Sequence, residues 1–194
     1  MEIDNTSHKI QISMKKVALF LAEGFEEVEA ITPVDVLRRA KIEITTISIG
    51  NSRQVTGAHN ITIMADTTFI DHNTDSYDAI ILPGGMPGTH NLNAHTGLKE
   101  LLFQFFKENK LIGAICAAPL ILGELGLLKN KDAICYPGFE NHLIGANLLN
   151  KTIVRDENII TANGVGAAIP FSLEIVEQLV GLEVAKQVAK KMLL

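Results

Sequence analysis

The feature that most constrains the fold is the alternation of short, fully apolar segments with segments of helical periodicity. The run VALFLA (17–22) contains no polar residue, which is typical of a strand buried on both faces. Residues 26–40 follow with helical spacing, and their apolar positions are Val28, Ile31, Val34 and Leu37. Pro33 lies inside this segment and predicts a kink or a break.

The same alternation continues along the chain. Further strands are predicted at 41–50, 60–65, 79–85, 111–116, 132–135, 152–154 and 158–162. Further helices are predicted at 96–108, 117–125, 169–180 and 182–192. Strands that alternate with helices predict an α/β fold with a mainly parallel sheet covered on both faces. Ligands of such sheets bind outside the carboxyl ends of the strands, so we expect the functional residues there.

A chain of 194 residues suits one domain, and we predict a single domain over 15–194. Residues 1–14 resemble an extension, either a loose tail or an added edge strand in which Ile10 and Ile12 alternate. This segment carries Glu2 and Asp4 and lacks the basic start and apolar centre of a secretory signal.

Charge and hydropathy exclude several classes of protein. The net charge of −5 argues against nucleic acid as a main partner, because phosphate binding requires a basic surface. No apolar run reaches the ~18–20 residues of a membrane span, so a membrane partner is not expected and a cytoplasmic location is predicted. The two cysteines, Cys116 and Cys135, do not form a disulfide framework and are expected to be free thiols.

Cys116 lies where an apolar strand passes directly into a helix. The residues around it are small, as a sharp strand-to-helix turn requires: Gly113, Ala114, Ala117 and Ala118. The N-terminus of a helix also favours a thiolate. A functional thiol and a small buried cysteine both remain open from this placement, whereas Cys135, predicted inside a short strand, is interpreted as a packing residue.

Two further strand ends carry candidate residues. Gly84 and Gly85 follow the strand at 79–85, where their amides form either an oxyanion site or a simple tight turn. Glu29 lies near the apolar face of its helix and is either a partly buried acid with a raised pKa or a solvated charge. Glu26 and Glu27, at the start of the same helix, are interpreted as ordinary partners of the helix dipole.

No cofactor and no metal are predicted. The chain contains neither GxGxxG nor GxxxxGK[ST], and none of the six histidines has the paired spacing of a metal site. His142 lies in the Gly-rich loop YPGFENHLIG after a short strand, which is consistent with a place near the carboxyl edge of the sheet.

Three segments in this order, VALFLAEGFEEVEA, YDAIILPGG and GAICAAP, resemble the ThiJ/PfpI superfamily. The stretches PVDVLRRA and TANGVGAAIPFSLEIVEQLVG extend the resemblance over about 15–190. It is closer to the branch of the parkinsonism-associated protein deglycase and the bacterial ThiJ/YajL proteins. The resemblance implies a flavodoxin-like three-layer α/β sandwich with a cysteine nucleophile elbow, and a homodimer.

The resemblance also implies roles for individual residues. Cys116 looks like the nucleophile-elbow cysteine of the family, which is easily oxidised to a sulfinate. Glu29 looks like the acid that hydrogen-bonds this thiol, and the amides of Gly85 and Ala117 would form the oxyanion site.

The chain departs from its relatives near the cysteine. Several relatives carry a His-Pro dipeptide where this chain has Tyr136 and Pro137. Tyrosine is no base near neutral pH, because its ordinary pKa is about 10. His142 is the candidate replacement.

The leading hypothesis is a cofactor-free, cysteine-dependent enzyme of glyoxalase or protein/nucleotide deglycase type. Its substrates would be small reactive aldehydes or glycated thiols and amines. The alternative is a cysteine-based oxidative-stress sensor or redox-regulated chaperone without turnover, and a weaker third is a non-catalytic dimer with a relict pocket. Peptidase activity is not expected, because the protease-like branch has a histidine where this chain has Ala117. Glutamine amidotransferases need a later His-x-Glu, which the chain lacks.

Overall fold

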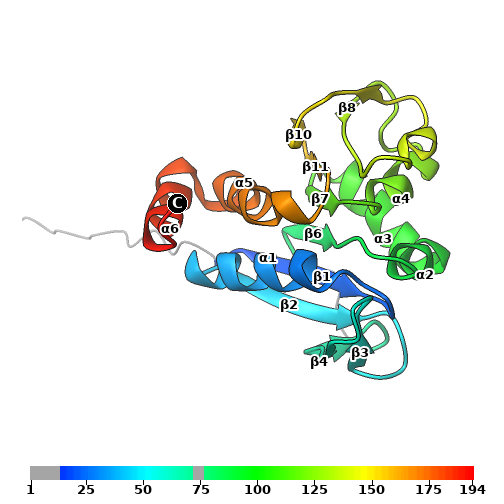
Figure 1. The fold of residues 1–194 in the computed structure, drawn as a ribbon, viewed down its shortest axis with the longest axis horizontal. Helices are drawn as coiled ribbons and strands as arrows, with labels where there is room; N and C mark the ends of the chain where they lie inside the picture. The colour runs from blue at the N-terminus through cyan, green and yellow to red at the C-terminus, as the bar shows by residue number, and fades with distance from the viewer. Residues whose placement is uncertain (1–13, 72–76) are drawn as a thin grey trace, which may run out of the picture.

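A seven-stranded sheet forms the centre of the computed structural model, which describes residues 14–71 and 77–194 (Figure 1). The strand order is β10-β11-β7-β6-β1-β2-β5, and every neighbouring pair is parallel except β10 with β11. The strands are β1 (Lys16–Leu21), β2 (Glu43–Ser48), β5 (Thr67–Thr68), β6 (Ala79–Leu82), β7 (Leu111–Ile115), β10 (Ile153–Asp156) and β11 (Ile159–Ala162). The predicted mainly parallel sheet is confirmed.

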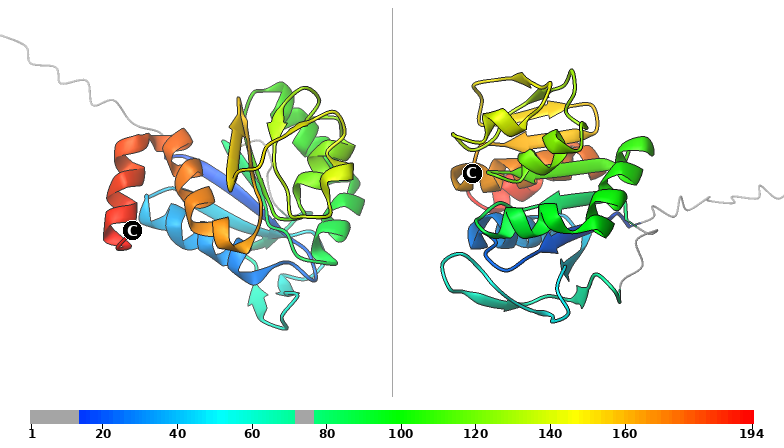
Figure 2. Two further views of the ribbon diagram at one scale, coloured as in Figure 1. Left: turned by 45° about the horizontal axis from the view of Figure 1, so that its top comes forward. Right: turned by 90° about the vertical axis from the view of Figure 1, so that its right-hand side faces the viewer.

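Side chains alternate across the sheet and build a core on each face. In β1, Val17, Leu19 and Leu21 pack into one core, whereas Ala18 and Phe20 pack into the other. The first core lies under α1 (Glu27–Arg39), α5 (Ala168–Val180) and α6 (Leu182–Lys191). The second lies under α2 (Gly88–Ala94), α3 (Thr96–Lys107) and α4 (Pro119–Glu124). Figure 2 shows these two layers of helices with the sheet between them, so the predicted three-layer arrangement is confirmed.

Helix α1 corrects two expectations. It runs from Glu27 to Arg39 without a break at Pro33, because that proline is buried and tertiary packing holds the helix together around it. The buried face comprises Ala30, Pro33, Val34 and Leu37, which recur at helical spacing. Val28 and Ile31, predicted on the apolar face, are instead 49% and 44% exposed.

Several predicted strands lie outside the main sheet or end earlier than expected. The segment predicted at 60–65 forms β4 (Thr62–Met64), which pairs antiparallel with β3 (Gln54–Thr56) in a separate hairpin. The segment predicted at 132–135 forms β8 (Asp132–Ala133), which pairs with β9 (Asn147–Leu148). Cys135 therefore follows its strand rather than lying in it, although it is buried as expected.

The remaining ordered turns are 3-10 helices at Glu140–His142 and Val165–Ala167. None of the helices in the described part of the chain is long and apolar enough to cross a membrane. The N-terminal extension was predicted to be either a loose tail or an added edge strand. Apart from Met14, its residues lie outside the described ranges.

The register of the parallel strands brings two loops together at the carboxyl edge of the sheet. Leu82 of β6 pairs with Ala114 of β7, so the chain leaves both strands at the same level. Gly84 and Cys116 each follow two residues later. The fold thus places the turns after β6 and β7 side by side, and α1 begins beside them after β1 (Figure 1).

Candidate active site

Cys116 occupies a strained turn between β7 and α4. Its φ angle is 63°, a left-handed conformation that non-glycine residues seldom adopt and that costs about 1–3 kcal/mol. The amide of Cys116 donates to Ala162 O at 2.9 Å, and its carbonyl accepts from Tyr136 N at 2.8 Å. The turn is held from both sides, and the sharp strand-to-helix geometry expected from the sequence is present one residue after the strand ends.

Gly84 permits the close approach on which the site depends. A Cβ atom at this position would lie 2.6 Å from Cys116 Cβ and 2.7 Å from Glu29 Oε2, distances that real side chains do not reach. Instead, the amide of Gly84 donates a hydrogen bond to Glu29 Oε2 at 2.9 Å. The absence of a side chain here lets the thiol and the carboxyl share one small space.

Glu29 is fully buried, which excludes the alternative of a solvated helix charge. Its second oxygen, Oε1, has no nitrogen or oxygen partner among the described residues. Burial raises the pKa of Glu29 to about 7, the nearby charge of Glu26 acts in the same direction, and the Gly84 amide opposes them. A carboxyl with such a pKa can both accept and donate a proton near neutral pH.

Cys116 and Glu29 act on each other. Burial raises the pKa of the Cys116 thiol to about 12, and the negative charge of Glu29 adds to this effect. Hydrogen bonds from the amides of Ala117 and Gly85 to the sulfur act in the opposite direction. Because two buried negative charges side by side repel each other, the pair favours holding one proton between them and titrates as a coupled unit.

Tyr136 and His142 are the two other candidates from the sequence. Tyr136 contacts Cys116 through its backbone, and its side chain is half exposed. His142 Nδ1 is 2.9 Å from Glu124 Oε1, at the end of α4 remote from Cys116. The ring of Phe139 lies between the two, 6.5 Å from that of Tyr136 and 6.3 Å from that of His142. Among the described contacts, none links His142 to the thiol.

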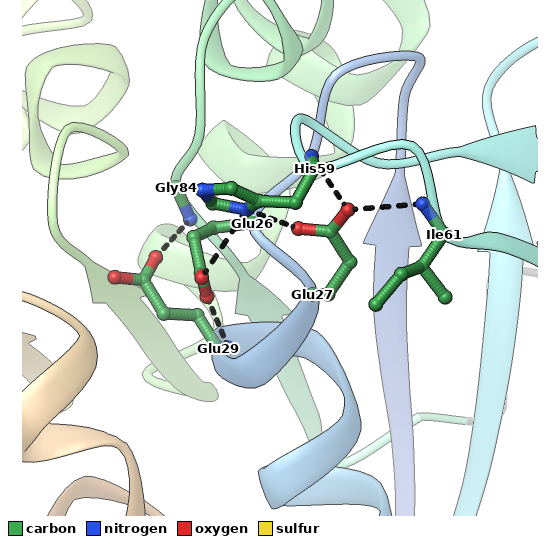
Figure 3. A network of polar contacts seen from close by, with 6 residues as sticks. All are labelled: Glu26, Glu27, Glu29, His59, Ile61 and Gly84. Atoms are coloured by element: carbon green, nitrogen blue, oxygen red, sulfur yellow. Dashed lines mark hydrogen bonds and ion pairs between the residues drawn. The ribbon is translucent and has the colours of Figure 1, made fainter.

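A network of acids and one histidine surrounds the start of α1, and no local pattern in the sequence indicates it. Glu26 caps the helix by accepting a hydrogen bond from Glu29 N at 2.7 Å (Figure 3). Glu27, interpreted from the sequence as a dipole partner, is buried and bound to His59 of the β3–β4 hairpin. His59 lies 32 residues further along the chain, so local spacing could not connect the two.

Glu26, Glu27 and His59 are also the group of described residues best placed to hold a metal ion, with one ligand atom from each within 4.8 Å of the others. However, His59 Nδ1 and Glu27 Oε2 are 2.7 Å apart and bond each other directly. Ligands of a tetrahedral zinc at ~2.0 Å would stand about 3.3 Å apart. The geometry is therefore that of a closed ion pair.

Comparison with known proteins agrees with this architecture. The model of the DJ-1/PfpI family matches residues 15–178. Protein dj-1beta of Drosophila melanogaster is 35% identical over 181 residues, covering 92% of this chain and 97% of the relative. The glutathione-independent glyoxalase DJ-1 of Schizosaccharomyces pombe is 33% identical over 175 residues, covering 85% and 91%. The structure of oxidized DJ-1 from Toxoplasma gondii is similar with a TM-score of 0.89 at 32% identity, covering 92% and 98%.

The layered fold with a cysteine at a strand-to-helix turn thus defines a flavodoxin-like α/β protein of DJ-1 type. The chain belongs to the DJ-1/PfpI family. The resemblance seen in its sequence is confirmed.

We expect Gly84→Ala to lower the free energy of unfolding by about 1–3 kcal/mol, because the added methyl must displace Cys116 or Glu29. Gly166→Ala is the matched control, since a Cβ there meets open space, and its effect should stay within about 0.5 kcal/mol. Urea denaturation measures both. Equal effects of the two substitutions would contradict the packing described for Gly84.

The raised pKa of Glu29 predicts a pH-dependent stability. Between its ordinary pKa of 4.5 and its folded pKa of about 7, the folded protein holds a proton that the unfolded chain has released. The contribution of Glu29 to stability therefore falls as pH rises through this window. Relative to Glu29→Gln, the parent should lose about 2–3 kcal/mol between about pH 5 and about pH 8. A stability difference that does not change with pH would show that Glu29 titrates normally.

Proposed function

We propose that the protein is a cysteine-dependent enzyme that converts small reactive dicarbonyls, such as methylglyoxal, into 2-hydroxy acids. The observation that carries this proposal is the buried contact between Cys116 and Glu29, with the amides of Gly85 and Ala117 directed at the same sulfur. A relative described as a glutathione-independent glyoxalase, 33% identical, supports the same class of reaction.

The first step is attack of the Cys116 thiolate on the aldehyde carbon of methylglyoxal. A carbon–sulfur bond forms, and the electron pair of the carbonyl moves to its oxygen. The amides of Gly85 and Ala117, which reach the sulfur itself, are close to where this oxyanion would develop. Glu29 accepts the proton of the Cys116 thiol as the attack begins and returns it to the oxyanion, so the product of the step is a hemithioacetal and Glu29 is again a carboxylate.

Glu29 performs the proton transfer in the second step. As a carboxylate it takes the proton from the former aldehyde carbon. The resulting enediolate accepts that proton back on the adjacent carbon, while its hydroxyl proton passes to the neighbouring oxygen. The outcome is a lactoyl thioester on Cys116, with no net gain or loss of electrons. A carboxyl with a pKa of about 7 suits both halves of this transfer.

Water then hydrolyses the thioester, so that lactate leaves and the thiol is restored. His142 is paired with Glu124 and is not assigned as a base at the thiol. Glu29 is therefore the proposed acid and base in both the attack and the proton transfer between carbons. The early adducts of the same aldehydes with thiols and amines carry a related carbonyl-derived carbon, and the deglycase reaction is proposed as a second use of this site.

The homodimer implied by the family resemblance stays a prediction. The half-exposed Val28 and Ile31 on α1 offer apolar surface close to the site that a second chain would cover.

The function is tested by lactate formation from methylglyoxal in the presence of a metal chelator. Cys116→Ser should reduce the rate to the uncatalysed background, and Glu29→Gln should reduce it by about 10²–10⁴-fold. Cys135→Ala, at the other free thiol, should keep most of the activity. Turnover by the parent no faster than by Cys116→Ser would reject the proposal.

A further inference from the structure

An ion pair lies next to the site but outside the residues that would touch the substrate. The side chain of Glu27 is 7% exposed, and its carboxylate accepts hydrogen bonds from the hairpin that carries His59. Oε1 accepts from His59 N at 2.7 Å and from Ile61 N at 3.4 Å, while Oε2 is 2.7 Å from His59 Nδ1 (Figure 3). The imidazole is 69% exposed and is tied to the start of α1 through its contact with Glu27.

Glu26 connects this pair to the site. Its Oε2 accepts from the amide of Glu29 at 2.7 Å, and its Oε1 is 3.9 Å from His59 Nδ1. The charge of Glu26 raises the pKa of Glu29. A positive charge at His59 offsets that of Glu26 and so counteracts this effect.

We propose that His59 is a positioning residue whose imidazolium, fixed by Glu27, screens the carboxylate of Glu26 and thereby sets how readily Glu29 exchanges its proton with Cys116. This inference rests on the role proposed above for Glu29. Among the described residues, Glu26 and Glu27 are the charged groups in contact with His59. Among the described residues, the charged or titratable groups in direct contact with Glu29 are Glu26 and Cys116.

The pairing with Glu27 raises the pKa of His59, so the screening charge persists closer to neutral pH than it would for a free histidine. As pH rises through the titration of His59, the positive charge is lost and Glu29 holds its proton more firmly. The site would therefore respond to pH through a residue that does not contact the thiol.

The experiment follows the titration of Glu29 in the free protein by carbon-13 NMR of its carboxyl group. His59→Gln should raise the pKa of Glu29 by a few tenths of a unit at low ionic strength, because the screening charge is lost. His59→Arg should restore the parent value, because it keeps a positive charge. At about 1 M salt the difference between parent and His59→Gln should largely disappear, since the Debye length falls to ~3 Å.

His142→Gln is the matched control, because His142 also pairs with a glutamate, at 2.9 Å, but away from Glu29. It should leave the pKa of Glu29 unchanged. The backbone bonds from His59 N and Ile61 N to Glu27 remain in every His59 variant, so the hairpin stays attached. A pKa of Glu29 unchanged in His59→Gln, or shifted equally by His142→Gln, would overturn the inference.

The outcome separates this inference from the proposed function. A shifted pKa of Glu29 without lactate formation by the parent would support the electrostatic role of His59 and reject the glyoxalase reaction. Cys116-dependent lactate formation with no shift in His59→Gln would support the reaction and overturn the role of His59.

Discussion

The close approach of two turns, one at Gly84 and one at Cys116, is the constraint on which the rest of the site depends. Parallel pairing of β6 with β7 ends both strands at one level, and the missing side chain at Gly84 lets the turns touch. Any β-carbon there would occupy the space between the thiol and Glu29. The left-handed conformation of Cys116 is tolerated because backbone hydrogen bonds to Ala162 and Tyr136 hold it.

The same approach explains why a carboxyl can be buried beside a thiol. An isolated buried carboxylate is costly, and Glu29 has one backbone donor for one of its two oxygens. Retaining a proton relieves the remaining cost, which is why its pKa is raised. A proton that is held loosely near neutral pH, next to a nucleophile and two amides, is what a reaction with proton transfer between carbons requires. The destabilising burial and the proposed chemistry thus have one physical origin.

The central strands and the sharp turn at Cys116 could be predicted from the sequence, because local sequence patterns determine both. Uninterrupted apolar runs such as 17–22 and 111–116 predicted the central strands, and small residues around Cys116 predicted its sharp turn. The buried face of α1 was predicted only in part: Val34 and Leu37 face the sheet, whereas Val28 and Ile31 do not, because which flank of a helix is covered depends on its neighbours. The network of Glu26, Glu27 and His59 could not be predicted, since the β3–β4 hairpin brings His59 back to α1 from a distant part of the chain.

The central claim, that Glu29 carries a proton near neutral pH beside Cys116, is tested most directly by infrared spectroscopy of the protonated carboxyl group. The account predicts a carboxylic acid band that is absent from Glu29→Gln and that disappears with a midpoint near pH 7 in the parent. A band that disappears near the ordinary carboxyl pKa of 4.5 would contradict the account, because Glu29 would then be a permanent anion at neutral pH.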